Sequence, residues 1–518
     1  MISRRLRLAL LLGILAVAFF ARFFALANIP PGLYPDEAIN GNDGLAAIRS
    51  AKPAVFFPEN NGREGLFINL VGLSVSPFGH KPWAIRLVSA LFGFFTVPGL
   101  YLLARRLLKN EYAALLAAFF LAVSFWHVNF SRIGFRAIMA PFFLVWGLYF
   151  LYRIYGKDAL SGAAGLCAAV AGGLLFGLGA HSYIAYRAAP ALLIVPFLSG
   201  ISYWRKNNKA SGGCFPCTFV LFVFFALVAA APLLLYFAGH PADFFGRTSQ
   251  ISVFAAQSPL AALRDNAAKT AGMFWFRGDG NWRHNIAGAA QLVWPVGILF
   301  ASGLLLVLWR MIRNRAFFSG TPALLFWWLV LFLLPVVSSN EGIPHALRAI
   351  IVLPAVSMLA AIGLQRLIGW SKPFVERLRL NTAALILLML TLGGIGAWDV
   401  GRYFLRWGMR PEVAGAFASR YTQIAQQLNN LPQESEKYVI VNAGGVPVSG
   451  IPMPAQTVMF ITDTASTKKQ REKHVTYLLP EQLRDAGALE LKPGAVFLME
   501  QDVVLERKAQ TLFNVSGM

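Results

Sequence analysis

The chain has 518 residues, of which 57% are hydrophobic and only 14% are charged, and its formal net charge is +22. Soluble domains contain about 25% charged residues, so this composition excludes a water-soluble globule and indicates a polytopic membrane protein. Lys and Arg of such proteins gather in short cytoplasmic loops. The positive charge therefore indicates topology in a lipid bilayer, and we expect no nucleic-acid partner.

The first apolar segment covers 8–27 and follows Arg4, Arg5 and Arg7. A cleaved signal peptide has a similar basic start, and Ala25-Leu26-Ala27 would suit cleavage. The run is long for such a peptide, however, and other apolar segments follow it. We therefore favour a retained first transmembrane helix.

Apolar segments recur along the rest of the chain, and a membrane-spanning helix needs about 20 such residues. We predict about 11–13 spans, with candidates at 8–27, 83–104, 111–127, 137–153, 159–180, 186–201, 216–238, 290–309, 321–337, 347–367 and 381–398.

Alternate loops between these segments are basic. They hold Arg105, Arg106 and Lys109, then Arg153 and Lys157, Arg205, Lys206 and Lys209, Arg310, Arg313 and Arg315, and finally Arg366, Lys372, Arg377 and Arg379. The positive-inside rule then predicts a cytoplasmic N-terminus, and we expect the protein to lie in the plasma (inner) membrane. The first loop (28–82), the long loop (239–289) and the residues after 400 are predicted to lie outside the cytoplasm.

The chain changes character after about residue 400. A polar, helix-like stretch covers 411–431, and short β-rich runs follow at 438–441, 457–461 and 495–498, separated by glycine-containing turns. We predict a transmembrane domain over 1–400 and a small soluble α/β domain over 401–518. The cysteines Cys214 and Cys217 form a solitary C-x-x-C, a weak signal, so we expect plain cysteines at a membrane boundary.

Unusual polar residues gather in the predicted outside loops. The carboxylates, arginines, histidines and tyrosine that we single out are Asp36, Glu37, Arg63, Glu64, His181, Tyr183, Arg283, His284, His345 and Arg348, together with Arg22 near the outer end of the first helix. A carboxylate can take the proton of an attacking hydroxyl, and guanidinium groups bind phosphate. These groups at a membrane face suit sugar transfer from a lipid phosphate carrier.

Several segments carry a family resemblance. They are PPGLYPDEAINGNDG, GREGLFINLVGLSVSPFG, FSRIGFRAIMAPF, RGDGNWRHNIAGAAQL and NEGIPHALRAIIVLPA. With them the chain resembles the GT-C glycosyltransferases, in particular the branch of protein O-mannosyltransferases and lipid A aminoarabinose transferases. The resemblance implies a GT-C type all-α membrane fold and transfer, with inversion, of a hexosyl or pentosyl group from a polyprenyl-phosphate-sugar donor to an extracytoplasmic acceptor.

The resemblance also implies roles for residues. Asp36 is the expected general base, and Glu37 beside it orients the acceptor or binds the backbone of its own loop, which we expect to be extended. We expect the donor phosphate to contact Arg22, Arg63, Arg283 and Arg348. We expect the substrates to contact Glu64, His181, Tyr183, His284 and His345.

Metal-using relatives carry an aspartate after the third helix, whereas 131–137 has no carboxylate here. We therefore expect no metal ion and no other cofactor, although Glu64 with His181 or His284 would offer ligands. The alternative function is a transporter or flippase of lipid-linked saccharides, which should carry charged or broken-helix features at mid-membrane.

Overall fold

The computed structural model describes residues 3–156, 158–207, 214–250, 252–255, 257–483 and 492–513. Lys157 and Lys209 of the predicted cytoplasmic loops lie outside the described residues. The chain divides into two compact units. Unit 1 contains Met1–Phe24, Ser89–Arg132 and Arg136–Trp407, and unit 2 contains Ala25–Val88, Ile133–Phe135 and Gly408–Met518. The predicted first outside loop is thus grouped with the C-terminal residues.

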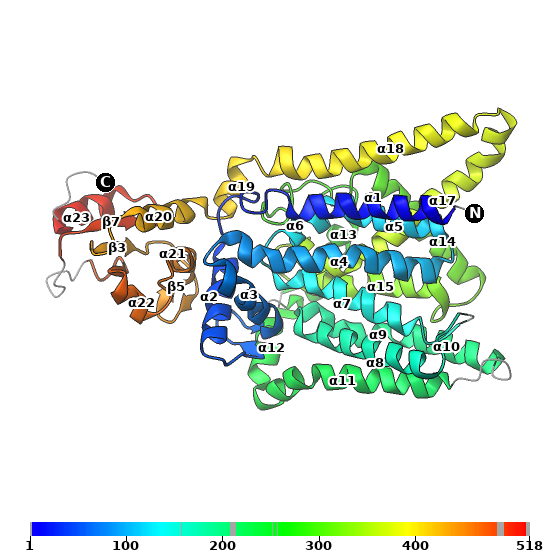
Figure 1. Cartoon of the computed structure of the whole chain (residues 1–518), viewed down its shortest axis with the longest axis horizontal. Helices are drawn as coiled ribbons and strands as arrows, with labels where there is room; N and C mark the ends of the chain where they lie inside the picture. Colours follow the sequence, from blue (N-terminus) through cyan, green and yellow to red (C-terminus); the bar gives the residue numbers. More distant parts are fainter. Residues whose placement is uncertain are drawn as a thin grey trace. The chain divides into compact units, whose positions relative to one another are not determined.

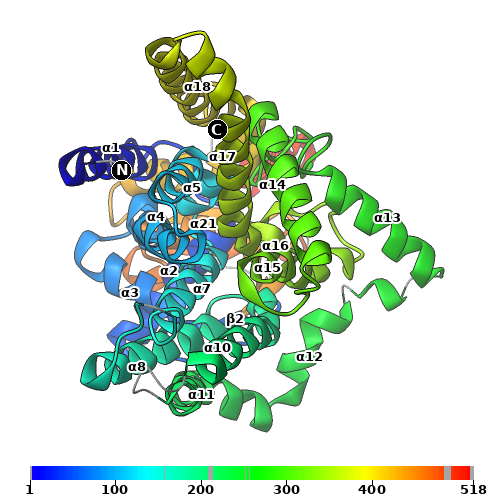
Figure 2. The ribbon, with the colours of Figure 1, turned by 90° about the vertical axis from the view of Figure 1, so that its right-hand side faces the viewer.

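Unit 1 is a bundle of long apolar helices, seen from the side in Figure 1 and nearly end-on in Figure 2. Its longer helices are α1 (Arg4–Phe23), α4 (Pro82–Leu108, from Ser89 onward), α5 (Glu111–Val123), α7 (Met139–Leu151), α8 (Gly162–Leu178), α10 (Ile194–Asn207), α11 (Phe215–Gly239), α14 (Trp294–Arg313), α15 (Gly320–Val337), α17 (Leu353–Arg377) and α18 (Asn381–Gly401). Shorter helices are α6 (Phe125–Ser131), α9 (Ala189–Leu192), α12 (Pro241–Gln250), α13 (Pro259–Gly272) and α16 (Ala346–Ala349).

The predicted spans are found as helices. Within the described ranges, nine helices are long and apolar enough to cross a membrane, and α5 with α6, bent by 58°, forms a tenth if the pair counts as one span. These ten fall on ten of the predicted segments. The remaining prediction, 137–153, falls on a shorter apolar helix, Arg136–Leu151. The polytopic helical fold is confirmed.

Glycines let neighbouring helices of unit 1 approach closely. A Cβ built on Gly303 of α14 would lie 1.9 Å from the Leu359 carbonyl oxygen of α17, and one on Gly363 of α17 would lie 2.0 Å from that of Leu299. Small residues are typical of helix contacts in membranes, where van der Waals packing replaces the hydrophobic effect. The first half of α17 is accordingly enclosed by its neighbours, since every residue from Leu353 to Leu364 is buried.

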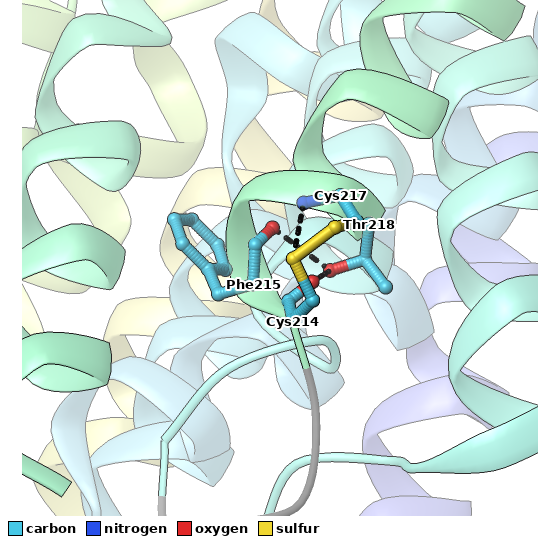
Figure 3. Close-up of a disulfide and its surroundings, with 4 residues drawn as sticks. All are labelled: Cys214, Phe215, Cys217 and Thr218. Atoms are coloured by element: carbon cyan, nitrogen blue, oxygen red, sulfur yellow. Dashed lines mark hydrogen bonds between the residues drawn. A yellow bond between two sulfur atoms is a disulfide. The ribbon is translucent and has the colours of Figure 1, made fainter. Parts of the chain in front are cut away.

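The C-x-x-C motif lies at the start of α11. Cys214 and Cys217 form a disulfide, and Cys214 is the N-cap residue, whose Sγ accepts a hydrogen bond from the Cys217 N–H (Figure 3). Both cysteines lie at the end of a predicted span, as expected. The bond between them was not predicted.

Unit 2 combines helices with short strands. Its first segment holds α2 (Pro35–Arg49), the antiparallel pair β1 (Phe56–Phe57) and β2 (Arg63–Glu64), and α3 (Gly65–Phe78). Its C-terminal segment holds α19 (Pro411–Ala416), α20 (Ser419–Asn430), β3 (Lys437–Ile440), β4 (Pro447–Val448), β5 (Ile451–Pro452), α21 (Gln456–Thr462), α22 (Thr467–Glu472), β6 (Val475–Leu478), β7 (Ala495–Leu498) and α23 (Val503–Phe513).

The predicted small α/β fold is present in that C-terminal segment. Its sheet is parallel, in the order β6-β3-β7, and Val439 is in register with Tyr477 and Phe497. Residues of α20 and α21 form one core with β3, and residues of α23 form another with the three strands. A parallel sheet with helices packed on its residues is the arrangement expected for an α/β domain.

One strand prediction is wrong. Residues 457–461 form most of helix α21, not a strand. Val458 and Met459 enter the core with α20 and β3, while the ring of Phe460 lies against Gly41 of α2. A short apolar run buried on several sides gives no reliable period, so tertiary packing decided its conformation.

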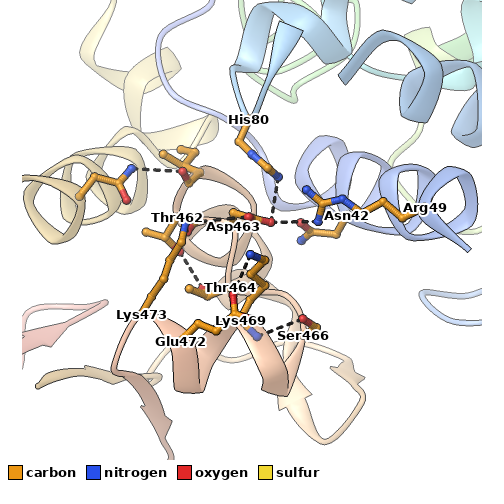
Figure 4. A network of polar contacts seen from close by, with 12 residues as sticks. Asn42, Arg49, His80, Thr462, Asp463, Thr464, Ser466, Lys469, Glu472 and Lys473 are labelled. Carbon is orange, nitrogen blue, oxygen red and sulfur yellow. Dashed lines mark hydrogen bonds and ion pairs between the residues drawn. The ribbon is translucent and has the colours of Figure 1, made fainter. Parts of the chain in front are cut away.

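The first loop is tied to α21 and to Asp463, the residue that follows it, by polar contacts within unit 2 (Figure 4). The Asp463 carboxylate accepts from Arg49 of α2 at 3.2 Å and from His80 at 3.1 Å. Asn42 donates to the Gln456 side chain at 2.8 Å. The C-terminal segment thus fixes the position of the helix that begins with the acid pair.

Candidate functional site

The acid pair opens helix α2, so the extended loop that we predicted is helical here. Pro35 occupies the first turn, where its missing N–H costs nothing, and Glu37 accepts from the Tyr34 N–H at 3.2 Å as half of a capping box. Consecutive residues of a helix point about 100° apart. Asp36 and Glu37 therefore enter different environments.

Glu37 is fully buried in an ion pair. Its carboxylate accepts from Arg86 Nε at 2.9 Å and Nη2 at 3.1 Å, and from the Gly134 N–H at 2.8 Å. The guanidinium of Arg86 also donates to the carbonyls of Pro30 and Gly32 at 2.7 Å each. Of the two roles considered for Glu37, these contacts fit the binding of backbone.

Asp36, unlike Glu37, is only half-buried and forms no ion pair among the described residues. Its Oδ1 accepts a hydrogen bond from Asn60 Nδ2 at 2.9 Å. Among the residues that the structure describes, Oδ2 of Asp36 has no hydrogen-bond partner. A carboxylate held by one oxygen and open at the other can accept a proton from a substrate.

Arg63 is buried in a second network of unit 2. It donates from Nη1 to Asn40 at 2.9 Å, from Nε to the Glu59 carbonyl at 3.3 Å, and from Nη2 to the carboxylate of Asp43. Burial raises the pKa of Asp43, and the neighbouring guanidinium opposes that rise. The guanidinium of Arg63 is thus occupied by protein groups, and Glu64 next to it is also buried.

Two of the predicted phosphate ligands in unit 1 also bind protein groups. Arg22, fully buried, donates to the carbonyls of Leu121 and Ala122 at the end of α5 and contacts His127 Nδ1 at 2.8 Å. It satisfies carbonyls that the α5 helix leaves open where it bends into α6. Arg348 donates to Ser339 and to the side chain and carbonyl of Glu341.

The other predicted residues lie in the loops of unit 1. Arg283 is half-buried, and its carbonyl accepts from Asn129 at 2.8 Å. His181 is buried, with its Nε2 2.9 Å from the Ala229 carbonyl oxygen of α11. The guanidinium of Arg136 lies over the ring of Tyr183, with its Cζ atom 5.8 Å from the ring centroid.

His284 and His345 come together with an aspartate that the sequence analysis did not single out. The ligand atoms of Asp279, His284 and His345 all lie within 4.8 Å of one another, and the Nδ1 of His284 is 2.8 Å from Asp279 Oδ2. Burial alone would raise the pKa of Asp279, but the two imidazoles and the Asn281 N–H hold it below its ordinary value. The cluster joins the segment before α14 to the segment before α16.

Two residues that organise these sites, Arg86 and Asp279, were not among the predicted site residues. Arg86 lies near the start of the predicted span 83–104, and a charge inside an apolar segment is itself a signal of a functional or structural partner. Asp279 lies in the noted segment RGDGNWRHN. Its partner His345 is distant in the sequence, so no spacing rule connects the two.

A family model of dolichyl-phosphate-mannose-protein mannosyltransferases matches residues 67–236, less than half of the chain. A search of curated proteins found no match.

Solved structures match over most of the chain. ArnT from Cupriavidus metallidurans bound to undecaprenyl phosphate is similar with a TM-score of 0.60 and 16% identity, over 96% of this chain and 97% of that one. The apo state of the same protein gives a TM-score of 0.56 and 16% identity, over 94% of this chain and 96% of that one. The archaeal oligosaccharyltransferase AglB from Archaeoglobus fulgidus gives a TM-score of 0.49 and 15% identity, over 92% of this chain and 64% of that one. The likeness to ArnT concerns the fold, and it shows that this chain has the GT-C type polytopic membrane fold.

Proposed function

We propose that this protein is an integral-membrane glycosyltransferase. It moves a hexosyl or pentosyl group from a polyprenyl-phosphate donor to an acceptor hydroxyl outside the cytoplasm, on a protein, lipid or polysaccharide, and inverts the anomeric centre. The GT-C fold supports this class of reaction, and ArnT, with the same fold, binds undecaprenyl phosphate.

The observation that carries the proposal is the difference between the two adjacent carboxylates. Glu37 is fully buried and occupied by Arg86 and Gly134, whereas Asp36 is half-buried and leaves Oδ2 without a partner among the described residues. Asp36 therefore accepts the proton of the acceptor hydroxyl while the hydroxyl oxygen bonds to the anomeric carbon. The bond from that carbon to the phosphate oxygen breaks, and polyprenyl phosphate leaves.

The leaving phosphate needs positive charge. Arg22, Arg63 and Arg348 direct their guanidinium groups to protein carbonyls, hydroxyls or carboxylates. The proposal keeps the four predicted arginines, Arg22, Arg63, Arg283 and Arg348, as the candidates for this role. No divalent ion at the donor phosphate is part of the proposal.

The test uses purified full-length protein and measures polyprenyl phosphate released from a labelled donor. We expect Asp36→Asn to slow release by about 10²–10⁴-fold, the usual contribution of a general base, without changing the melting temperature. Asp265→Asn is the matched control, because that carboxylate is exposed and, within the described ranges, forms only a surface pair with Lys269. Wild-type turnover in Asp36→Asn would place the base elsewhere. Movement of the intact donor across vesicles without release of polyprenyl phosphate would favour a flippase.

A further inference from the structure

Asp279, His284 and His345 converge from two separate segments of unit 1. Asp279 and His284 lie between α13 and α14, and His345 is the N-cap residue of α16. Asp279 and His284 are each only 4% exposed. The two imidazole rings lie with their centroids 4.9 Å apart.

The buried carboxylate of this cluster lacks a strong cationic partner. Within the described part of the chain, Asp279 forms an ion pair only with His284, and no lysine or arginine reaches it. A buried charge is costly unless it is paired or binds a metal. A cation held between Asp279 and the imidazoles would compensate that charge.

The donor set points to the kind of cation. Two imidazoles and one carboxylate are borderline ligands that suit zinc, whereas calcium and magnesium prefer oxygen ligands alone. Zinc bonds of about 2.0–2.2 Å place tetrahedral ligand atoms about 3.4 Å apart. The three ligand atoms here lie within 4.8 Å, so small rotations of the side chains would bring them to that separation.

The surrounding backbone already orients the carboxylate. The Asn281 N–H donates to Asp279 Oδ1 and the Ala346 N–H donates to Oδ2, both at 2.8 Å. Such outer contacts are typical of metal ligands, whose orientation they fix. We infer that Asp279, His284 and His345 form a binding site for a divalent transition-metal ion of the zinc class.

The ion would have a structural role. It would join the segment that carries Arg283 to the segment that carries Arg348, and both segments belong to unit 1. This inference does not rest on the proposed sugar transfer, because metal content is measured without substrate.

The experiment uses the full-length protein, purified in detergent through an affinity tag without histidine, and measures bound metal by mass spectrometry. We expect about one zinc ion per chain in the wild type and a loss of most of it in His284→Gln and in His345→Gln. His345→Cys, which restores a zinc ligand, should retain the ion. His240→Ala is the matched control, because His240 is exposed and lies outside the cluster.

A second measurement guards against variants that fail to fold. Wild-type protein stripped with a strong chelator should melt at a lower temperature and regain its melting temperature when zinc is added. The inference is overturned if stripped, folded wild type takes up no more zinc than the Asp279→Asn/His284→Gln/His345→Gln variant. It is overturned equally if His345→Gln retains zinc at the wild-type level.

Discussion

The buried pair Glu37–Arg86 offers the sharpest test of the assignment of the two acidic residues. Both side chains are 0% exposed, and Glu37→Gln would leave the Arg86 guanidinium buried without its counter-charge. Removing one partner of such a pair typically costs about 3–5 kcal/mol. Arg86 keeps its bonds to the carbonyls of Pro30 and Gly32, so we expect a cost near the lower end, about 3 kcal/mol.

That cost corresponds to roughly a 100-fold change in the unfolding equilibrium, since about 1.4 kcal/mol is tenfold. Denaturant unfolding in detergent, followed by tryptophan fluorescence, measures it. We expect Glu37→Gln/Arg86→Gln to lose less stability than the sum of the two single variants, because neither charge is then left alone. Asp36→Asn should show the opposite pattern, with near-normal stability and little transfer.

The pattern can be contradicted clearly. If Glu37→Gln keeps wild-type stability but loses transfer as Asp36→Asn does, Glu37 belongs to the reaction and not to the framework. If the double variant loses as much stability as the two single variants together, the two residues are not coupled, and the structural role of the ion pair fails.

Further predictions concern packing, pH, topology and metal use. Gly72→Ala should destabilise unit 2 by about 1–3 kcal/mol, because its Cβ would lie 2.1 Å from the Gly44 carbonyl oxygen, while Gly415→Ala, with nothing within 4 Å, should melt normally. Burial lowers the pKa of His80 although Asp463 opposes the shift. The unfolded chain therefore binds more protons below about pH 6.5, and stability should fall as the pH falls through that range, an effect that His80→Gln should reduce in pH-dependent melting curves. A cysteine placed at Ser435 should react with an impermeant maleimide in intact cells, and one at Asn207 only after permeabilisation; the reverse would invert the proposed topology. Sugar transfer should proceed without added magnesium or manganese and during brief exposure to EDTA. If EDTA abolishes transfer and either ion restores it, a metal ion takes part at the donor phosphate and this prediction is wrong.

Local composition determined much of this protein. Long apolar runs predicted the helices of the bundle, because a span needs only length and hydrophobicity. The change to polar and β-rich sequence after residue 400 predicted the small α/β domain for a similar reason: strands β3 and β7 carry β-branched and aromatic residues between turn signals. The resemblance pointed to the GT-C fold through segments that are continuous in the sequence.

Tertiary structure decided what depends on distant partners. Residues 457–461 became a helix because they are buried against both α20 and α2. Glu37 and Asp36 are equivalent in the sequence, and only the approach of Arg86 and Gly134 makes one of them a buried ion pair. Likewise, the guanidinium groups of Arg22, Arg63 and Arg348 contact protein groups, and Asp279 meets His345 across two loops. The charge and type of a side chain are local properties, whereas its partners are fixed only when the chain packs.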